Sequence, residues 1–324
     1  MGYTAVVGED RVTIVVATRD RRDDLERSLP RHEVKVIVVD NGSVDGTAAA
    51  VRERHPRIEV VELGANRGAP ARNVGVARAG TPYVAFADDD SWWAPGALAL
   101  AADVLDAYPR VAVLAARVLV GGSQRLDPTC SEMATAPLGI SAGSPGPAVL
   151  GFMACGAVVR RDAFLACGGF DDVVFFAGEE ERVALDLAAA GWALAYVPAV
   201  VAHHHPSPVR DVAHRRALVV RNAVLVAVLR RPWSVVAHRM IGALRGGAAS
   251  RAGLLSALPR IPRAWARRRR LPDDVEAARQ ALDEIDESNP LVSARLPGPS
   301  GVPCPITPGR ARRSDHAPRG PRTR

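Results

Sequence analysis

The chain has 324 residues, 48% of them hydrophobic and 24% charged, with a formal net charge of +7. This composition excludes a disordered chain and supplies a core for one large α/β domain with additions or for two average domains. The amino terminus lacks the basic-then-apolar order of a signal peptide, and apolar stretches such as 217–229 are too short to span a bilayer. We therefore expect a cytoplasmic protein without a transmembrane helix.

The cysteines show none of the close pairing typical of zinc sites or redox motifs, so we expect reduced thiols. They are Cys130, Cys155, Cys167 and Cys304.

The first 62 residues alternate between strand-like and helix-like patterns. Runs rich in β-branched residues at 12–17, 35–40 and 58–62 predict strands, and the segments 22–29 and 48–54 between them predict helices. Strands that alternate with helices through short connections are typical of a right-handed parallel α/β sheet.

Three adjacent aspartates, Asp88, Asp89 and Asp90, follow the apolar run 83–87, which predicts a further buried strand. Open α/β sheets bind ligands at the carboxyl ends of their strands, so the triplet lies where a ligand is expected. The three carboxylates repel one another unless a divalent cation neutralises them, as Mg²⁺ does when it also binds substrate phosphates. The alternative is a solvated acidic turn that caps the next helix.

Arg72 lies near the start of the helix expected before residue 79, close to Gly68. A basic residue there, with a glycine that allows close approach, would suit a phosphate, although a surface arginine in a helix is common. Further elements are expected as a helix at 96–108 and strands at 111–120 and 157–160. The segment 121–149 between these strands has no clear period and is typical of a functional loop or lid.

Glu179, Glu180 and Glu181 begin a predicted helix that ends at Gly191. The helix macrodipole favours acids there, which explains one or two of the three glutamates without any chemistry. A last strand at 192–202 leads into three histidines. A histidine cluster after a strand can bind metal, whereas a single histidine is more often structural.

Residues 212–272 contain fourteen arginines and no acidic residue. Apolar residues at helical spacing alternate with these arginines, which favours a basic amphipathic segment on an anionic membrane surface. A solvated helical hairpin and a nucleic-acid-binding segment are the alternatives, the latter without a recognised motif. The Pro-, Gly- and Arg-rich residues after 288 are expected to be disordered.

The chain resembles the family 2 glycosyltransferases, inverting enzymes with the GT-A fold that use nucleotide-sugar donors. The resemblance extends over about 12–205 and depends on five blocks in the family's order. They are residues 18–21, 39–47, 66–73, 86–95 and 168–192.

The resemblance implies an α/β fold of the GT-A type: a mostly parallel, Rossmann-like sheet flanked by helices, with a C-terminal helical extension. We expect a glycosyltransferase domain at 1–210, a basic helical extension at 211–287 and a disordered tail at 288–324.

The resemblance also implies roles for individual residues. Glu180 is the expected general base with Glu179 beside it, and Asp90 and His203 are the expected ligands of Mg²⁺ or Mn²⁺. Thr18 and Asp40 are expected to contact the nucleotide base, and Asp88 the ribose. The full set of expected donor-binding residues is Thr18, Arg19, Asp40, Asn41, Arg72, Asp88 and Asp89.

Two residue choices depart from the family pattern. Arg182 and Asp186 exchange the places of the family's aspartate and arginine, but they can still pair one helical turn apart. The expected base is a glutamate rather than an aspartate, and its carboxylate is one methylene farther from the backbone.

The resulting prediction is a metal-dependent inverting glycosyltransferase that moves a sugar from a nucleotide-sugar donor to a hydroxyl of a glycan, lipid-linked or other cell-envelope acceptor. Residues 212–272 would give peripheral contact with the inner face of the plasma membrane, and nucleic acid is not an expected partner. A sugar-phosphate nucleotidyltransferase is the first alternative, although the first strand lacks a glycine-rich phosphate loop. A non-catalytic nucleotide-sugar-binding scaffold is the second, although it would be free to lose Asp88, Asp90, Glu180 and His203.

Overall fold

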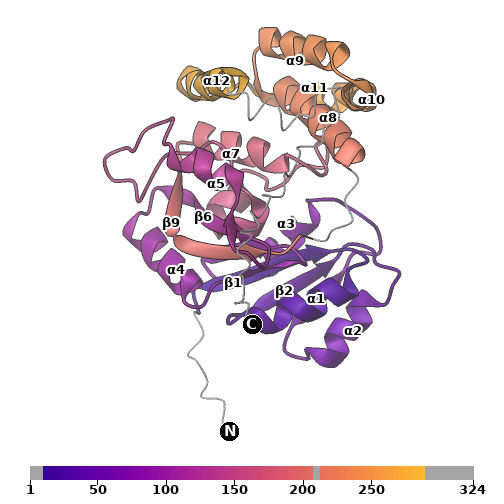
Figure 1. Cartoon of the computed structure of the whole chain (residues 1–324), viewed down its shortest axis with the longest axis vertical. Coiled ribbons are helices and arrows are strands. Elements are labelled where there is room, and N and C mark those ends of the chain that lie inside the picture. Colours follow the sequence, from indigo (N-terminus) through magenta and orange to yellow (C-terminus); the bar gives the residue numbers. More distant parts are fainter. Residues whose placement is uncertain (1–9, 207–211, 289–324) are drawn as a thin grey trace, which may run out of the picture.

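The computed structural model describes residues 10–206 and 212–288. Within these ranges nine strands form one sheet in the order β3-β2-β1-β4-β8-β6-β9-β5, with β7 paired to β6. Helices flank this sheet, and the last helices form a separate layer at one end of the molecule (Figure 1). The predicted α/β fold with a C-terminal helical extension is confirmed. The tail predicted to be disordered, and Cys304 within it, lie outside the described residues.

The amino-terminal half of the sheet is parallel. It consists of β1 (Val12–Thr18), β2 (Val36–Asp40), β3 (Glu59–Glu62) and β4 (Tyr83–Ala87). Every residue of β2 and β4 is buried, as expected for parallel strands covered on both faces. Because the carboxyl ends of parallel strands meet at one edge of the sheet, the polar residues that follow β1, β2 and β4 come together.

The second half of the sheet is mixed. β8 (Ala157–Arg160) is antiparallel to β4 and to β6 (Val111–Val120), whereas β9 (Ala193–His204) is parallel to β6. The short strand β5 (Ser91–Trp93) pairs with the end of β9, and β7 (Arg125–Leu126) pairs with β6. The β5–β9 pairing brings the residues that follow the aspartates beside the histidines.

The helices that connect the strands, apart from α5, were expected from the sequence at similar positions. They are α1 (Arg22–Ser28), α2 (Thr47–Arg54), α3 (Ala71–Arg78), α4 (Ala97–Ala107), α5 (Pro128–Ala134), α6 (Arg161–Ala166) and α7 (Glu179–Ala189), with 3-10 turns at Leu29–Arg31 and Ala154–Gly156. Gly191 has a φ of 81° just after α7, which agrees with its predicted role in ending this helix.

The segment 121–149, predicted to be irregular, contains β7 and helix α5. The carboxylate of Asp127 accepts a hydrogen bond from the Thr129 amide at 2.8 Å, and Pro128 occupies the first turn of α5. An aspartate N-cap followed by proline is a local helix start signal. The Gly- and Ser-rich composition around it obscured this signal.

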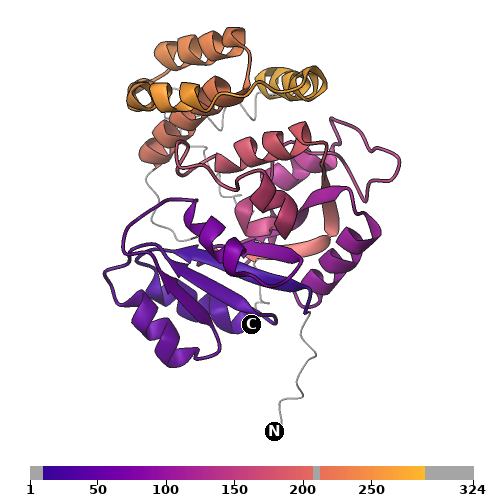
Figure 2. The same cartoon turned by 180° about the vertical axis from the view of Figure 1, so that it is seen from behind.

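The C-terminal extension is a layer of helices, coloured orange to yellow in Figures 1 and 2. It contains α8 (Val212–Arg230), α9 (Trp233–Arg245), α10 (Ala248–Ala257), a 3-10 turn at Leu258–Arg260, α11 (Ile261–Ala266) and α12 (Asp273–Ser288). Its apolar residues share a core with Val173, Val174 and Leu185 from the region before and within α7. Among the helices of the described ranges, none combines the length and apolar character needed to cross a membrane.

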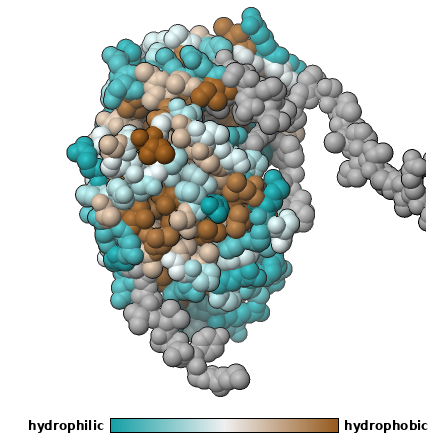
Figure 3. Space-filling view, turned by 60° about the vertical axis from the view of Figure 1, so that its left-hand side comes forward, coloured by the Kyte–Doolittle hydropathy of each residue, from teal (hydrophilic) through white to brown (hydrophobic). Residues whose placement is uncertain are grey.

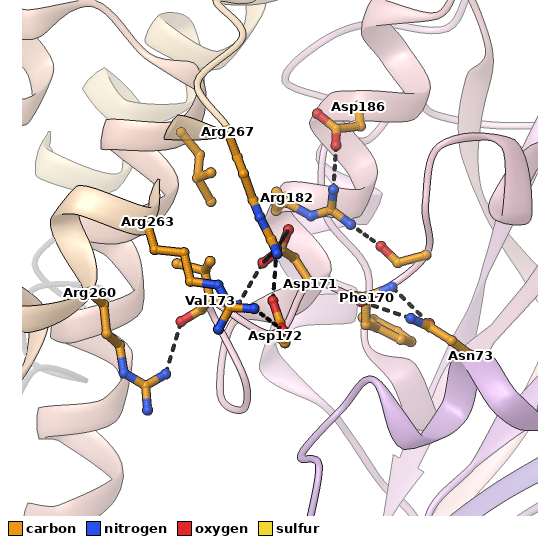
Figure 4. A network of polar contacts seen from close by, with 12 residues as sticks. Asn73, Phe170, Asp171, Asp172, Val173, Arg182, Asp186, Arg260, Arg263 and Arg267 are labelled. Atoms are coloured by element: carbon orange, nitrogen blue, oxygen red, sulfur yellow. Dashed lines mark hydrogen bonds and ion pairs between the residues drawn. The ribbon is translucent and has the colours of Figure 1, made fainter. Parts of the chain in front are cut away.

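Arginines of α11 and of the residues directly before and after it hold the loop between α6 and α7 (Figure 4). Arg263 and Arg267 pair with Asp172 at 2.5 and 2.8 Å, and Arg260 donates a hydrogen bond to the Val173 carbonyl at 3.0 Å. This loop leads directly into Glu179, so the extension helps to position the start of α7.

A second set of arginines is buried inside the extension. Arg231, with a fully buried side chain, places Nε 2.7 Å from Glu276 and Nη1 2.8 Å from Asp283 of α12. Arg230 pairs with Asp186 of α7. Arginines predicted to face a membrane or solvent are thus engaged within the protein. Their acidic partners lie before and after the segment 212–272.

Candidate active site

A cavity of about 490 Å³ lies at the sheet edge where β1, β2 and β4 end, and we call it the sheet-edge cavity. Seven described residues of the predicted site contribute to its lining, together with Asn66 and Gly68 from the block 66–73 and with Phe175, which was not predicted. The predicted residues that line it are Thr18, Arg19, Asn41, Arg72, Asp88, Asp89 and Asp90. The strand ends thus bring together side chains from sequence positions 18 to 90, as the parallel order of β1, β2 and β4 requires.

Asp88, Asp90 and His204 form a cluster that could hold a metal ion. One ligand atom from each lies within 4.8 Å of the other two, and His204 Nε2 is 3.3 Å from Asp90 Oδ1. Ser91 of β5 pairs with His204 of β9, and this pairing holds His204 beside the residue that precedes Ser91, Asp90. Two carboxylate oxygens and an imidazole nitrogen are a donor set that suits Mn²⁺ or Mg²⁺.

The structure places His204, rather than the predicted His203, in this cluster. Successive residues of a strand point to opposite faces, and β9 continues through both histidines. The His203 ring instead stacks on Trp92, with ring centroids 5.5 Å apart. The structure thus brings His204, and not His203, beside Asp88 and Asp90, and metal binding by either histidine stays a prediction.

Asp89, the middle aspartate, faces Thr18 rather than the cluster. Its carboxylate accepts a hydrogen bond from the Thr18 hydroxyl at 3.2 Å. Burial raises the pKa of Asp89 to about 7, and the charges of Asp88 and Asp90 add to the effect. Asp89 is therefore more easily protonated than an ordinary aspartate, mainly because it is buried and also because two carboxylates flank it.

Arg72 connects the aspartates with the start of α7. Its buried guanidinium lies 2.6 Å from Asp88 and 3.7 Å from Glu179. Burial raises the pKa of Glu179 to about 8, and the neighbouring Glu180 adds to this shift, whereas Arg72 opposes it. Because Arg72 lies closer to Asp88, it does not overcome the cost of a buried charge on Glu179.

Glu180 faces a second cavity, of about 780 Å³, which we call the α5–α12 cavity after the two helices that flank it. Its carboxylate accepts a hydrogen bond from the Ala154 amide at 3.4 Å. Burial raises the pKa of Glu180, and the Asp88 carboxylate acts in the same direction. A carboxylate with a raised pKa is suited to general base catalysis near neutral pH. The start of α7 thus stands between the two cavities, with Glu179 toward Arg72 and Glu180 toward the α5–α12 cavity.

Asp40 and Asn41 hold the loops around the sheet-edge cavity. Asp40 is buried and accepts a hydrogen bond from the Ser43 amide at 3.3 Å, and it is not among the described residues that line the cavity. Asn41 donates to the Gly68 carbonyl and accepts from the Arg67 amide, at 3.1 and 2.7 Å. Contact between Asp40 and a nucleotide base stays a prediction, whereas Asn41 clearly shapes the cavity wall.

Sequence reasoning missed the residues that enclose the sheet-edge cavity from the other side. Phe175 and Phe176 precede α7, and His214 and Arg215 belong to the first turn of α8. A side chain at Gly68 would collide with Phe175, whose carbonyl would lie 2.5 Å from the added Cβ. Asn222 of α8 donates hydrogen bonds to the Phe176 and Ala177 carbonyls, at 2.5 and 2.6 Å. The extension therefore completes the cavity, a role for which the sequence held no motif.

Residues 13–167 match the family model described as Glycosyl transferase family 2. The N-acetylglucosaminyl-diphospho-decaprenol L-rhamnosyltransferase of Mycobacterium tuberculosis is 29% identical over 241 residues, covering 60% of this chain and 76% of that protein. The pre-mycofactocin glycosyltransferase of Mycobacterium tuberculosis is 32% identical over 233 residues, covering 67% of this chain and 47% of that protein. Both relatives are named as glycosyltransferases.

The fold is also that of solved glycosyltransferases. The mannosyltransferase PcManGT from Pyrobaculum calidifontis, solved in complex with GDP-Man and Mn²⁺, superposes with a TM-score of 0.55 at 24% identity, covering 88% of this chain and 84% of that one. This likeness confirms the predicted GT-A fold. The family match and the two relatives, for their part, show that this chain belongs to glycosyl transferase family 2 and is a glycosyltransferase.

Proposed function

We propose that the protein is a metal-dependent, inverting glycosyltransferase that transfers a sugar from a nucleotide-sugar donor to a hydroxyl of a lipid-linked or other cell-envelope glycan. The observation that carries this proposal is the cluster of Asp88, Asp90 and His204 beside a cavity that Thr18, Arg19 and Arg72 also line. The rhamnosyltransferase relative, whose name specifies a decaprenol-linked substrate, supports the acceptor class.

In the proposed reaction Glu180 accepts the proton of an acceptor hydroxyl as that oxygen attacks the anomeric carbon of the donor sugar. The bond between this carbon and the diphosphate breaks on the opposite face, so the anomeric configuration inverts. A divalent cation held by Asp88, Asp90 and His204 would supply positive charge for the leaving diphosphate. Thr18, Arg19 and Asn41 would hold the nucleotide, and Arg72 would orient the Asp88 carboxylate through their ion pair.

A thermal-shift panel of nucleotide sugars, with and without Mn²⁺, tests the donor and the metal together. A ligand that binds only the folded protein raises its Tm. We expect at least one nucleotide sugar to raise the Tm in the presence of Mn²⁺ and Asp90→Ala to abolish this shift. Asp162→Ala, which removes an exposed carboxylate of α6, should leave the shift intact.

The panel can contradict the proposal in two ways. Nucleotide sugars that shift the Tm equally with and without Mn²⁺ would refute metal dependence. A complete nucleotide-sugar panel without any shift would refute the donor class.

We retain the proposed division of the chain into a glycosyltransferase domain and a helical extension, and we propose that the extension contacts an anionic membrane surface. Many of its arginines are engaged internally, so the support now comes mainly from exposed apolar side chains. Trp233, Leu244, Leu255 and Trp265 are 48%, 58%, 66% and 61% exposed on α9, α10 and α11. Tryptophan is enriched where a protein meets the interface of a bilayer.

Flotation with phosphatidylglycerol vesicles tests this contact. We expect the full chain to float with these vesicles at low salt, and Trp265→Ser combined with Leu255→Ser to reduce flotation severalfold. Leu100→Ser, which removes an exposed apolar residue of α4, is the matched control. Equal flotation of the three proteins would refute the proposed surface.

A further inference from the structure

The interior of the α5–α12 cavity is largely apolar. Its volume of about 780 Å³ falls within the range of cavities that bind small molecules. Apolar side chains reach it from both the glycosyltransferase domain and the extension: Met133, Val149, Leu150, Phe152, Leu282 and Ile285. An apolar lining of this extent favours a ligand that has an apolar group of its own.

The charged residues of this cavity are mainly acidic. Glu132, Glu180 and Glu181 line it, and Arg279 is the basic residue among its described lining. The Arg279 guanidinium is already engaged, 2.5 Å from Asp283 and 3.7 Å from Glu181. Although burial alone would raise the pKa of Glu181, the guanidinium groups of Arg239 and Arg279 lower it, so this carboxylate remains charged. A phosphate inside the cavity would therefore meet negative charge without a cation to balance it.

The cavity is also placed to deliver a hydroxyl to Glu180. Glu180 forms part of its wall, while the neighbouring Glu179 lies against Arg72 of the sheet-edge cavity. An acceptor in the α5–α12 cavity and a donor in the sheet-edge cavity would thus approach Glu180 from different sides. Figure 3 brings the flank of the molecule with α12 forward and shows apolar residues, in brown, gathered in patches on this face.

We propose that the α5–α12 cavity binds the acceptor as an uncharged sugar attached to an apolar group, and that Leu282 and Ile285 of α12 contact this apolar group. Such an acceptor carries no phosphate between its sugar and its apolar group, so among lipid-linked acceptors the cavity selects those without this phosphate. This inference rests on the proposed function because it takes Glu180 as the base that receives the acceptor proton. It also gives the extension a direct part in choosing the substrate.

The test compares three probes on the full chain: octyl β-glucoside below its micelle concentration, glucose, and glucose 1-phosphate. Dissociation constants come from calorimetry or from saturation-transfer NMR. We expect octyl glucoside to bind at least tenfold more tightly than glucose, because its alkyl chain leaves water. We expect glucose 1-phosphate to bind more weakly than glucose.

The substitution Ile285→Ser tests whether the alkyl chain of octyl glucoside binds beside α12. Ile285 is 44% exposed, so its replacement should preserve the fold, and we expect octyl glucoside to bind at least threefold more weakly. Leu100→Ser on α4, where Leu100 is 38% exposed, should leave the affinity unchanged. Glucose 1-phosphate binding more tightly than octyl glucoside, or equal effects of the two substitutions, would overturn the inference.

The Mn²⁺-dependent thermal shift with nucleotide sugars, measured on the same samples, separates this inference from the proposed function. Donor binding without octyl glucoside binding would refute the acceptor inference and leave the glycosyltransferase proposal standing. Octyl glucoside binding that depends on Ile285, without donor binding, would support the cavity assignment and contradict the proposed donor.

Discussion

At the sheet edge, buried carboxylates lie close to other carboxylates, whereas in the helical extension the buried Arg230 and Arg231 lie beside carboxylates. Asp89 and Glu179 have pKa values raised to about 7 and 8 because burial and neighbouring carboxylates both disfavour their charge. Arg231, by contrast, has Glu276 and Asp283 within 2.8 Å. The first arrangement stores unfavourable charge that a cation or a proton can relieve, and the second is complete without a ligand.

This difference separates a binding site from a structural contact. A surplus of one sign in a buried place costs folding free energy, and it is retained where a ligand supplies the opposite charge. A balanced cluster such as that of Arg231 mainly holds helices together. The charge composition of the sequence does not distinguish a site with surplus charge from a balanced cluster. Whether buried charges balance depends on which segments of the chain meet in the fold.

The largest expected effect tests the sheet-edge side of this comparison. Glu180→Gln should reduce the rate of transfer by about 10²- to 10⁴-fold, the usual contribution of a general base. Mn²⁺-dependent donor binding should be retained, because Glu180 faces the other cavity. Glu53→Gln, an exposed change on α2, serves as control in the same transfer and thermal-shift assays. Unchanged turnover in Glu180→Gln would remove this residue from the mechanism.

The next prediction concerns the balanced cluster. Arg231→Met should lower the free energy of unfolding by about 3–5 kcal/mol, because Glu276 and Asp283 would lose their buried counter-charge. Arg245→Met, at an exposed position of α9, should change it by no more than about 0.5 kcal/mol. Urea unfolding followed by circular dichroism measures both. Equal free energies of unfolding for the two variants would contradict this prediction, since the Arg231 cluster would then contribute little to stability.

A third prediction sharpens the description of the metal cluster. His204→Ala should weaken Mn²⁺-dependent nucleotide binding at least about tenfold, a loss seen even for residues that only orient a ligand. His203→Ala should have a smaller effect on this binding, because that ring stacks on Trp92. Titration of Mn²⁺ at a fixed nucleotide concentration compares the two variants, with the Tm of each apo protein as the check on folding. The reverse order of effects would restore His203 as the ligand.

The smallest expected effect is a dependence of stability on pH. Glu179 has a pKa of about 8 when folded and about 4.5 as an ordinary glutamate, so the unfolded chain releases this proton first. Wild-type stability should therefore fall as the pH rises from about 4.5 to about 8. Glu179→Gln removes this fall and should be more stable than wild type by about 1 kcal/mol at pH 8, since relaxation reduces the cost of a buried charge.

Tm values between pH 5 and pH 9 measure this difference. The difference in stability between Glu179→Gln and wild type should grow with pH up to about 8 and then stay constant, because Glu179 of the wild type is ionised above that value. A difference that is already complete at pH 5 would show that the proton on Glu179 is not its source.

Local patterns alone were sufficient for the strands, the main helices and the position of Asp88 and Asp90 at the sheet edge, whereas the expectation for Glu180 depended on the family resemblance. Short, β-branched or aromatic apolar runs such as those of β2 and β4 favour buried strands, and the ends of parallel strands must meet at one edge. Three features depended on contacts between distant segments. The pairing of β5 with β9 selects His204 over His203, the acids at 171–186 and 276–283 neutralise the arginines of the extension, and α12 forms a cavity wall beside Glu180. Sequence periodicity reports which face of an element is buried, but only the tertiary structure decides which other element covers it.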